Sequence, residues 1–335
     1  MEHPYHYRNK AQYPAQTVDG QPSFGFYAKR SHRLVSAVGC KNVLPVNDEI
    51  IFAVTEYMTE NGVSAYDEES HSGTVRHLTT RAAFDTGEIM VCLSINAKSL
   101  PHKERLTGRL KKIPGVTCVA ACVNTKRTNA VMDGEIKILW GRGFITDTAA
   151  GMRFNISPAS FYQVNPVMTE TVYGTAREYA GLTRGGGLAV ADLYCGIGTV
   201  TLCLADCAAK VIGIDSSESA VRDARENAKQ NGVTNAEFIC GKAEDALEKL
   251  YADGAKFDAI VVDPARRGCD VRLLDTIGSR GPGRVVYISC DPASLARDVK
   301  ILYEYGYKLS KIKPVDCFPF TPHVETVALL EKFIF

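Results

Sequence analysis

The 335-residue sequence lacks several features that mark whole classes of protein. It contains no low-complexity tract, and no apolar run approaches the roughly 20 residues needed to span a bilayer. Its first residues, MEHPYHYRNKAQ, are polar and aromatic, so they do not resemble a secretory signal. The sequence therefore predicts a globular protein of the cytoplasm that makes no contact with a membrane.

The sequence also lacks any Cys-x-x-Cys pair, although it holds eleven cysteines. In a chain without an export signal, this number indicates reduced thiols rather than a disulfide framework. Cys118 and Cys122 are four residues apart, as are Cys203 and Cys207. The second pair falls on a predicted helix, where small apolar packing is the favoured interpretation over metal binding. We predict no metal site.

The small net charge of +1 conceals a gradient along the chain. Residues 1–155 hold 19 basic against 15 acidic residues, and residues 156–335 hold 20 against 23. The first 42 residues hold six basic and two acidic residues, interleaved with Tyr5, Tyr7, Tyr13, Phe24, Phe26 and Tyr27. Cations beside stacking rings suit single-stranded nucleic acid. A solvated strand face with its aromatic rings in the core fits the composition equally well.

Residues 1–155 are predicted to form an α+β domain with a mostly antiparallel sheet. A helix is expected over residues 45–62, with Asn47 or Asp48 as its cap and Gly62 as its stop. The predicted strands are β-branched or alternating segments bounded by Gly, Pro and Asn: SFGFYAKRSHRLV, TVRHLTTRAAF, GEIMVCLSIN and GVTCVAACVN.

Residues 156–335 have a different pattern, in which apolar strands alternate with helices. Nearly continuous apolar strands separated by helices predict a doubly wound, mostly parallel sheet covered on both faces. Ser217 or Ser219 is expected to cap a helix that ends at Gly232. The predicted strands include GLAVADLYC, AKVIGID, AEFICG, FDAIVVDPAR and RVVYISCDP. The fold class is therefore α/β with an N-terminal α+β domain, divided at about residue 155.

A glycine loop follows the strand in VADLYCGIGTVTL, where Gly196 and Gly198 allow the backbone to approach a ligand. Asp215 lies 19 residues after Gly196, at the end of VIGID, where an acid can accept hydrogen bonds from ribose hydroxyls. The third glycine of a dinucleotide fingerprint is missing, because Thr201 stands there. A cofactor without phosphates needs less help from a helix dipole, so S-adenosylmethionine fits better than NAD.

Two further strands end in Asp263 and Cys290, and in a doubly wound sheet both ends face the crevice of the glycine loop. Asp291 and Pro292 are a good N-cap and first residue for the following helix. The positive end of that helix is expected to lower the pKa of the Cys290 thiol toward neutrality, partly opposed by the charge of Asp291. An inert buried cysteine is the alternative.

The last segment, YKLSKIKPVDCFPFTPHVETVALLEKF, predicts two antiparallel strands joined by a proline-rich turn. If the first runs with the parallel sheet, the second starts at the carboxyl edge, and Glu325 lies on the same edge as Cys290. A thiol, a carboxylate and a methyl-donor pocket suit methylation of pyrimidine carbon 5. Cys290 would be the nucleophile, Glu325 the base and Asp263 a hydrogen-bonding partner in the cleft.

With these residues the chain resembles the RNA (uracil-5-)-methyltransferase family, whose members modify tRNA or 23S ribosomal RNA. SFYQVN, DLYCGIGT, DPARRG, SCDPASLARD and HVETVALL span residues 160–330 in the family's order. The resemblance implies a Rossmann-like class I methyltransferase sheet with an antiparallel last strand. It also implies contacts to S-adenosylmethionine at Gln163, Tyr194, Thr199, Asp215 and Asp263. Asp215 and Asp291 depart from the commonest family pattern, which has Glu and Asn there.

The N-terminal half, with YRNKAQ and GFYAKRSHRLV, resembles the family's central RNA-binding domain. The resemblance favours RNA as the partner of the basic residues Arg8, Lys10, Lys29, Arg30 and His32. Full-length relatives often carry an oligonucleotide-binding barrel and three cysteines that, with one near Cys40, hold an iron–sulfur cluster. Neither feature is found here, so we expect no cluster, and either a truncated chain or a short natural form.

Three other functions compete with this assignment. Amino-methyltransferases usually carry an aromatic residue after Asn/Asp-Pro-Pro, whereas DPAR has Ala265 and Arg266. RNA cytosine-5 methyltransferases usually add a cysteine to the Asp263 segment, which has none. A non-catalytic RNA-binding protein with the same fold would be expected to lose part of the constellation. Resemblance favours 23S rRNA over tRNA as the substrate, and we expect a monomer.

Overall fold

The computed structural model describes residues 1–333, and its internal contacts divide the chain into two compact units. The first, the N-terminal unit, consists of residues 2–147 and 155–159. The second, the C-terminal unit, consists of Met1, residues 148–154 and the chain from residue 160 onward. The chain thus crosses between the units several times around residues 147–160.

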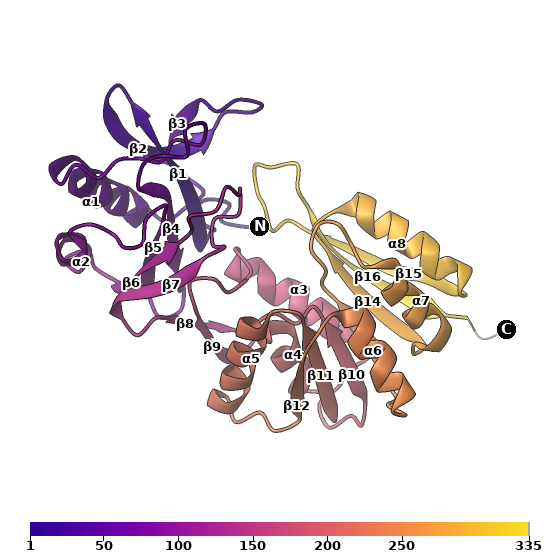
Figure 1. The fold of residues 1–335 in the computed structure, drawn as a ribbon. Coiled ribbons are helices and arrows are strands. Elements are labelled where there is room, and N and C mark those ends of the chain that lie inside the picture. The colour runs from indigo at the N-terminus through magenta and orange to yellow at the C-terminus, as the bar shows by residue number, and fades with distance from the viewer. Residues whose placement is uncertain (334–335) are drawn as a thin grey trace. The chain divides into compact units, whose positions relative to one another are not determined.

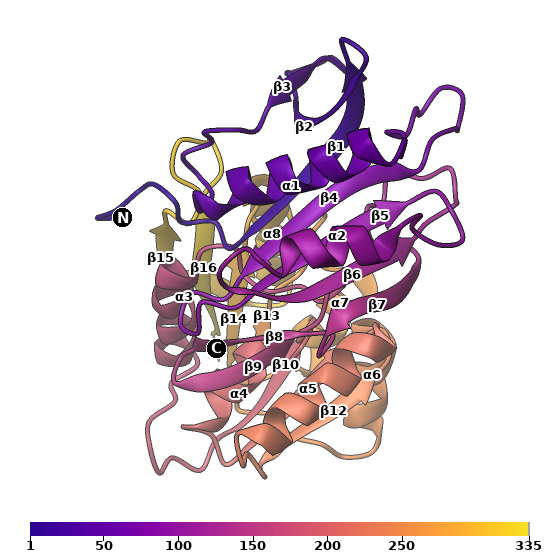
Figure 2. The same cartoon turned by 90° about the vertical axis from the view of Figure 1, so that its left-hand side faces the viewer.

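The N-terminal unit is built on a seven-stranded sheet with the order β3-β2-β1-β4-β5-β6-β7. All neighbouring strands are antiparallel except β5 and β6, so the predicted α+β domain with a mostly antiparallel sheet is confirmed. Two helices pack beside one face of this sheet (Figures 1 and 2). The elements are β1 (Lys10–Val18), β2 (Gln21–Tyr27), β3 (Leu34–Ser36), α1 (Val46–Glu60), β4 (Val75–Ala82), β5 (Ile89–Ile95), α2 (Lys103–Leu110), β6 (Val116–Val123) and β7 (Glu135–Gly141).

Helix α1 begins at Val46, and the predicted cap at Asn47 or Asp48 is wrong. Pro45 is the N-cap residue, with no side-chain capping bond. Asn47 is instead buried inside the first turn, where its Oδ1 accepts hydrogen bonds from the hydroxyls of Tyr13 (3.1 Å) and Thr80 (2.5 Å). The helix does end where expected, because Gly62, with φ +61°, follows the C-cap residue in the left-handed region.

Strand β1 lies outside the segments that the sequence pattern predicted as strands. Its interior residue Pro14 argues against a strand in mid-sheet, because proline cannot donate a ladder hydrogen bond. The register explains how it is accommodated: Pro14 pairs with His77 of β4, whereas pairing with β2 begins one residue later, at Ala15. Pro14 is therefore the last residue that pairs with β4, and pairing with β2 starts only after it.

The C-terminal unit is built on a second seven-stranded sheet, with the order β12-β11-β10-β13-β14-β16-β15. Strands β10 to β14 are mutually parallel, and β16 is antiparallel to both of its neighbours. The strands are β10 (Ala189–Leu193), β11 (Lys210–Asp215), β12 (Ala236–Cys240), β13 (Ala259–Val262), β14 (Arg284–Ser289), β15 (Tyr307–Val315) and β16 (Glu325–Lys332). A separate two-stranded ladder joins β8 (Ile145–Ala149) to β9 (Met152–Ile156).

Helices cover both faces of this sheet (Figure 1). Alternate strand residues enter different cores: Val190 packs with residues of α3 and α4, and Ala191 packs with residues of α6, α7 and α8. The helices are α3 (Pro166–Tyr179), α4 (Thr199–Ala205), α5 (Glu218–Gln230), α6 (Ala243–Ala252), α7 (Val271–Arg280) and α8 (Pro292–Glu304). Ser217 caps α5, as one of the two predicted alternatives.

The predicted Rossmann-like fold, doubly wound with an antiparallel last strand, is confirmed. One feature was not predicted: the last strand, β16, inserts between β14 and β15 rather than adding at the edge. The strand order reverses between β10 and β13, which is where open α/β sheets bind ligands. None of the helices in residues 1–333 is both long enough and apolar enough to cross a bilayer.

Candidate active site

The glycine loop connects β10 to α4 at the point where the strand order reverses. It is a left-handed turn, with φ of +70° at Tyr194, +55° at Gly196 and +85° at Gly198. The backbone N–H groups of Tyr194 and Cys195 both donate to the carbonyl oxygen of Ile214 in β11, which holds the loop to the sheet. A Cβ on Gly196 would meet no atom within 4 Å. The loop therefore leaves open space beside its backbone, as a nucleoside ligand requires.

Asp215 ends β11 and lies against this loop. Its Oδ2 accepts from the Gly196 N–H at 2.9 Å, and its Oδ1 accepts from the Ser217 N–H at 2.8 Å. The predicted pairing of the glycine loop with an acid at the end of the next strand is thus present in the structure. A carboxylate at this strand end, beside an open loop, fits hydrogen bonding to ribose hydroxyls.

Asp192 and Thr201 form a buried pair under the loop that was missed as part of the site. Asp192 is fully buried in β10, where its Oδ2 accepts from the Thr201 hydroxyl at 2.5 Å. Its Oδ1 has no hydrogen-bond partner among residues 1–333. Burial raises the pKa of Asp192 to about 8. The sequence contained a signal for this residue, because Asp192 stands in the middle of an apolar strand. A carboxyl group is costly to bury unless it has a function or a partner.

The side chain of Thr201 also explains a glycine elsewhere in the fold. A Cβ on Gly213 of β11 would lie 2.8 Å from Thr201 Oγ1 and 2.9 Å from the Phe238 ring. Thr201 therefore occupies the position of the third glycine in a dinucleotide fingerprint, and its hydroxyl donates to Asp192. This arrangement agrees with the exclusion of a dinucleotide.

Gln163 and Asp263 are 100 residues apart in sequence and meet at the carboxyl edge of the sheet. Gln163 Nε2 lies 3.5 Å from Asp263 Oδ2. Thr199, at the start of α4, accepts from the Tyr173 hydroxyl at 2.9 Å. The predicted cofactor residues thus lie at the carboxyl ends of β10, β11 and β13, or, for Gln163, in contact with Asp263 at that edge.

Glu325 and Asp263 are two carboxyl groups with raised pKa values, and the charge of Asp263 acts on Glu325. Glu325, the first residue of β16, is only 3% exposed, and burial together with the charge of Asp263 raises its pKa to about 8. Burial likewise raises the pKa of Asp263 to about 7, opposed by its hydrogen bond from Gln163. Strongly perturbed acids in a crevice are typical of functional sites.

Cys290 follows β14 directly and is partly exposed. The expectation that the α8 N-terminus lowers its pKa is wrong: the pKa of the thiol is raised, by burial first and then by the negative charge of Glu325. The positive charge of Arg266 acts in the opposite direction, and that of Asp263 raises the pKa further. The thiol therefore depends on nearby cations more than on the helix.

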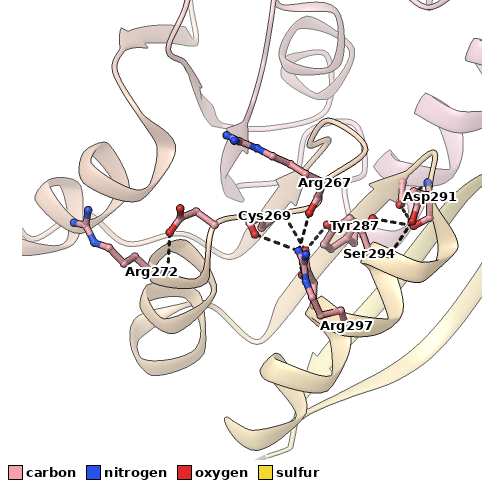
Figure 3. A network of polar contacts seen from close by, with 10 residues as sticks. Arg267, Cys269, Arg272, Tyr287, Asp291, Ser294 and Arg297 are labelled. Atoms are coloured by element: carbon pink, nitrogen blue, oxygen red, sulfur yellow. Dashed lines mark hydrogen bonds and ion pairs between the residues drawn. The ribbon is translucent and has the colours of Figure 1, made fainter.

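Helix α8 begins as predicted, with Asp291 as its N-cap residue and Pro292 as its first residue. Asp291 Oδ1 accepts from the Ser294 N–H at 2.8 Å (Figure 3). This hydrogen bond lowers the pKa of Asp291, which therefore carries its negative charge at the helix terminus. A carboxylate at this position interacts favourably with the positive end of the α8 dipole.

The predicted RNA contacts all lie in the N-terminal unit, around β1, β2 and β3. Lys29, Arg30 and His32 are exposed in the turn between β2 and β3, with His32 Nδ1 4.0 Å from Glu68 Oε2. Arg8 and Lys10 are partly buried, and burial with the charges of two arginines lowers the pKa of Lys10 to about 8.

The aromatic residues near these cations divide into two groups. Tyr5, Phe26 and Tyr27 are 38–51% exposed, which leaves their rings available for stacking. The other three belong to the core: Tyr7, Tyr13 and Phe24 are at most 2% exposed. The core interpretation is therefore confirmed for Tyr7, Tyr13 and Phe24, and RNA stacking stays a prediction for Tyr5, Phe26 and Tyr27.

The two pairs of cysteines that are four residues apart are packed in apolar cores. Cys118 and Cys122 lie in β6, and Cys203 and Cys207 pack against the sheet of the C-terminal unit. Within residues 1–333, no group of three or more His, Cys, Asp or Glu side chains is arranged to hold a metal ion.

Comparisons with known proteins identify the family. Residues 137–333 match the family model described as tRNA (uracil-5-)-methyltransferase. An uncharacterized RNA methyltransferase of Halalkalibacterium halodurans is 46% identical over 99% of this chain and 72% of its own length. One from Caldanaerobacter subterraneus is 43% identical over 99% of this chain and 73% of its own length.

Solved structures agree with this match. The crystal structure of Pyrococcus abyssi tRNA (uracil-54, C5)-methyltransferase with S-adenosyl-L-homocysteine is 29% identical, with a TM-score of 0.78 over 98% of this chain and 76% of that one. A SAM-dependent methyltransferase from Agrobacterium tumefaciens shares the fold, with a TM-score of 0.50 and 17% identity over 77% of this chain and 87% of that one. The resemblance read from the sequence motifs is confirmed. This chain is an RNA methyltransferase and belongs to the tRNA (uracil-5-)-methyltransferase family.

Proposed function

We propose that this protein methylates carbon 5 of a uridine in RNA through a covalent bond between Cys290 and the uracil ring. The observation that carries this proposal is the strand register: the Ser289–Thr326 pair puts Cys290 and Glu325 at the same end of β14 and β16, and Asp263 follows β13, the other neighbour of β14. The charges of Glu325 and Asp263 both raise the pKa of Cys290. A non-catalytic RNA-binding protein would have no need to keep a thiol and two buried acids together at that place.

Carbon 5 of uracil is a poor nucleophile, and the chain's residues are arranged to change that. The Cys290 thiolate adds to carbon 6, which moves electron density to carbon 5. Bound S-adenosylmethionine supplies an electrophilic methyl group to that carbon. Glu325 then accepts the carbon 5 proton, the ring double bond re-forms, and the Cys290 thiolate is released. Asp263 contributes a hydrogen bond in the cleft. The target base has to leave its stack to reach these groups.

We assign the methyl donor to the open space beside the glycine loop. Asp215 would accept from the ribose hydroxyls, and the Gly196–Gly198 backbone would approach the ligand. Gln163, Tyr194, Thr199 and Asp263 complete the proposed contacts. The space at Gly196 supports this assignment, because a Cβ there would meet no atom within 4 Å. Under the loop, the buried Asp192 Oδ1 is a polar atom without a hydrogen-bond partner among residues 1–333. The Pyrococcus relative was solved with S-adenosyl-L-homocysteine, the product of the same donor.

The RNA substrate is proposed to be 23S rRNA, on the resemblance of YRNKAQ and GFYAKRSH to the ribosomal branch of the family. Transfer RNA is the second candidate, favoured by the Pyrococcus enzyme, which acts on tRNA uracil-54. Residues 1–155 would bind RNA through Arg8, Lys10, Lys29, Arg30 and His32, and residues 156–335 would carry out the transfer. We propose that the protein works as a monomer in the cytoplasm, where its eleven free thiols stay reduced.

Trapping with 5-fluorouridine RNA tests the mechanism, because fluorine at carbon 5 blocks the final proton removal. With enzyme and S-adenosylmethionine we expect a covalent protein–RNA adduct on a denaturing gel. The adduct is absent from Cys290→Ala and unchanged in Cys240→Ala, which alters an exposed cysteine at the end of β12. An adduct that persists in Cys290→Ala would refute the assignment. Mass mapping of rRNA and tRNA from cells that lack the protein identifies the substrate.

A further inference from the structure

A buried carboxylate in α8, outside the residues assigned above, holds the loop between β13 and α7 in place. Asp298 is 0% exposed and accepts three hydrogen bonds. Its Oδ2 accepts from the Cys269 N–H at 2.8 Å and from the Tyr287 hydroxyl at 2.7 Å. Its Oδ1 accepts from Arg297 Nε at 2.8 Å and lies 2.6 Å from Arg297 Nη2 in an ion pair.

Arg297 also binds the backbone of this loop, and together Asp298 and Arg297 form a clamp on it. Its Nη2 donates to the carbonyl oxygens of Arg267 at 2.8 Å and Cys269 at 3.4 Å. Between them, Gly268 has φ +77°, and a Cβ there would lie 2.5 Å from Arg297 Nη2 and 2.6 Å from Asp298 Oδ2. The loop thus passes so close to α8 that only glycine fits at position 268. Side chains of the helix bind both an N–H group and two carbonyl oxygens of the loop backbone.

The clamp joins three segments that carry the proposed chemistry. The first segment is the loop, which starts immediately after Asp263 and carries Arg266. The second is β14, where Tyr287 lies three residues before Cys290, and the third is α8, which starts just after Cys290. Strand β13 pairs in parallel with β14, with Val262 opposite Tyr287, so the loop that carries Arg266 and the segment that starts with Cys290 leave the sheet at the same end of adjacent strands. In agreement with this placement, the charge of Arg266 lowers the pKa values of both Cys290 and Asp291. Arg266 Nη2 is also 3.3 Å from His323 Nε2, on the segment that leads to Glu325.

We propose that Asp298 and Arg297 are positioning residues for the reaction: by fixing the loop against α8 they keep Arg266 beside Cys290 and so favour the thiolate. This inference rests on the proposed role of Cys290 as the nucleophile. A purely structural clamp would stabilise the fold without affecting the ionisation of the thiol. The two roles differ in the pH dependence of the covalent step.

The other charged groups that act on Cys290 are Glu325 at the start of β16 and Asp263 after β13, both of which oppose the thiolate. Arg266 is the cation that counters them. Loss of its fixed position should therefore move the ionisation of Cys290 to higher pH, by about half a unit to one unit. Below the midpoint, such a shift slows the reaction about threefold to tenfold.

The test measures the rate of adduct formation with 5-fluorouridine RNA and S-adenosylmethionine from pH 6 to pH 10. We expect Arg297→Gln to raise the pH midpoint and to regain the wild-type rate at high pH. Arg272→Gln is the matched control: Arg272 donates to Asp245 at 3.0 Å from the exposed surface of α7, and its loss should leave the midpoint unchanged. A wild-type midpoint in Arg297→Gln overturns the proposal.

A double-mutant cycle with Arg266→Gln separates positioning from a general weakening of the fold. If Arg297 acts through Arg266, the pH midpoint of the double variant should be the same as that of Arg266→Gln alone. Fully additive shifts overturn the proposal. Arg297 is half exposed, so its variant is expected to fold, which circular dichroism checks. If wild-type enzyme forms no adduct, the proposed function fails instead, so the two failures are distinguishable.

Discussion

Glu325 and Cys290 lie at the same end of two neighbouring antiparallel strands. Thr326 of β16 pairs with Ser289 of β14, so Glu325 precedes and Cys290 follows the same rung of the ladder. Because β16 runs against β14, its first residue meets the carboxyl edge where the parallel strands end. Through this register the proposed nucleophile and the proposed base would both reach one pyrimidine ring.

Glu325→Gln is expected to stop the reaction after methyl transfer. The amide cannot accept the carbon 5 proton, so the covalent adduct should accumulate with unmodified RNA, and turnover should fall by about 100-fold or more. Denaturing gels and a methyl-transfer assay measure both quantities. Glu331→Gln, on the same strand and paired with Arg284 at 3.5 Å, should turn over normally. Normal turnover in Glu325→Gln would exclude it as the base.

The same residue should make stability depend on pH. Burial raises the pKa of Glu325 to about 8, so between about pH 4.5 and pH 8 the folded protein keeps a proton that the unfolded chain has released. Wild-type stability therefore falls as the pH rises through this window, and Glu325→Gln removes that contribution. We expect the variant to gain several degrees in Tm over wild type at pH 8.5 and almost nothing at pH 4.5. An equal gain at both values would contradict the raised pKa.

Thr201→Val tests the buried pair under the glycine loop. The substitution keeps the shape of the side chain but removes the hydroxyl that Asp192 Oδ2 accepts from. A buried hydrogen bond lost at one partner costs about 1–3 kcal/mol, so binding of S-adenosylmethionine should weaken about tenfold while RNA affinity is unchanged. Thr175→Val, which removes a hydroxyl that bonds within α3, is the control. Calorimetry of donor binding decides, and equal affinities in the two variants would remove Asp192 from the site.

Replacement of both Lys29 and Arg30 by Ala tests the proposed RNA surface. Both side chains are exposed between β2 and β3. Each phosphate contact contributes to the salt dependence of binding, so RNA affinity should fall and the slope of log K against log salt should decrease by about one to two. Lys229→Ala, on exposed α5, should leave both unchanged. A double variant with the wild-type slope would show that RNA binds elsewhere.

Local patterns predicted much of the C-terminal unit correctly. Apolar strands between amphipathic helices indicate a parallel sheet in any context, because each strand must bury both faces. The Asp291–Pro292 start of α8 and the Ser217 cap of α5 follow from hydrogen bonds within one turn. Asn47 shows the limit: its side chain suits a cap, yet Tyr13 and Thr80, brought from other strands, take it into the core.

The amino-acid sequence by itself determined which chemical groups stand at the strand ends, since Cys290, Asp263 and Asp215 each follow an apolar run that the local pattern identifies. Only the tertiary structure decided how these groups behave. The approach of Gln163 to Asp263, the insertion of β16 and the clamp at Asp298 depend on contacts between distant segments. The raised pKa of Cys290 has the same origin, because it is caused first by burial and then by the charge of Glu325, which lies on a distant segment of the chain.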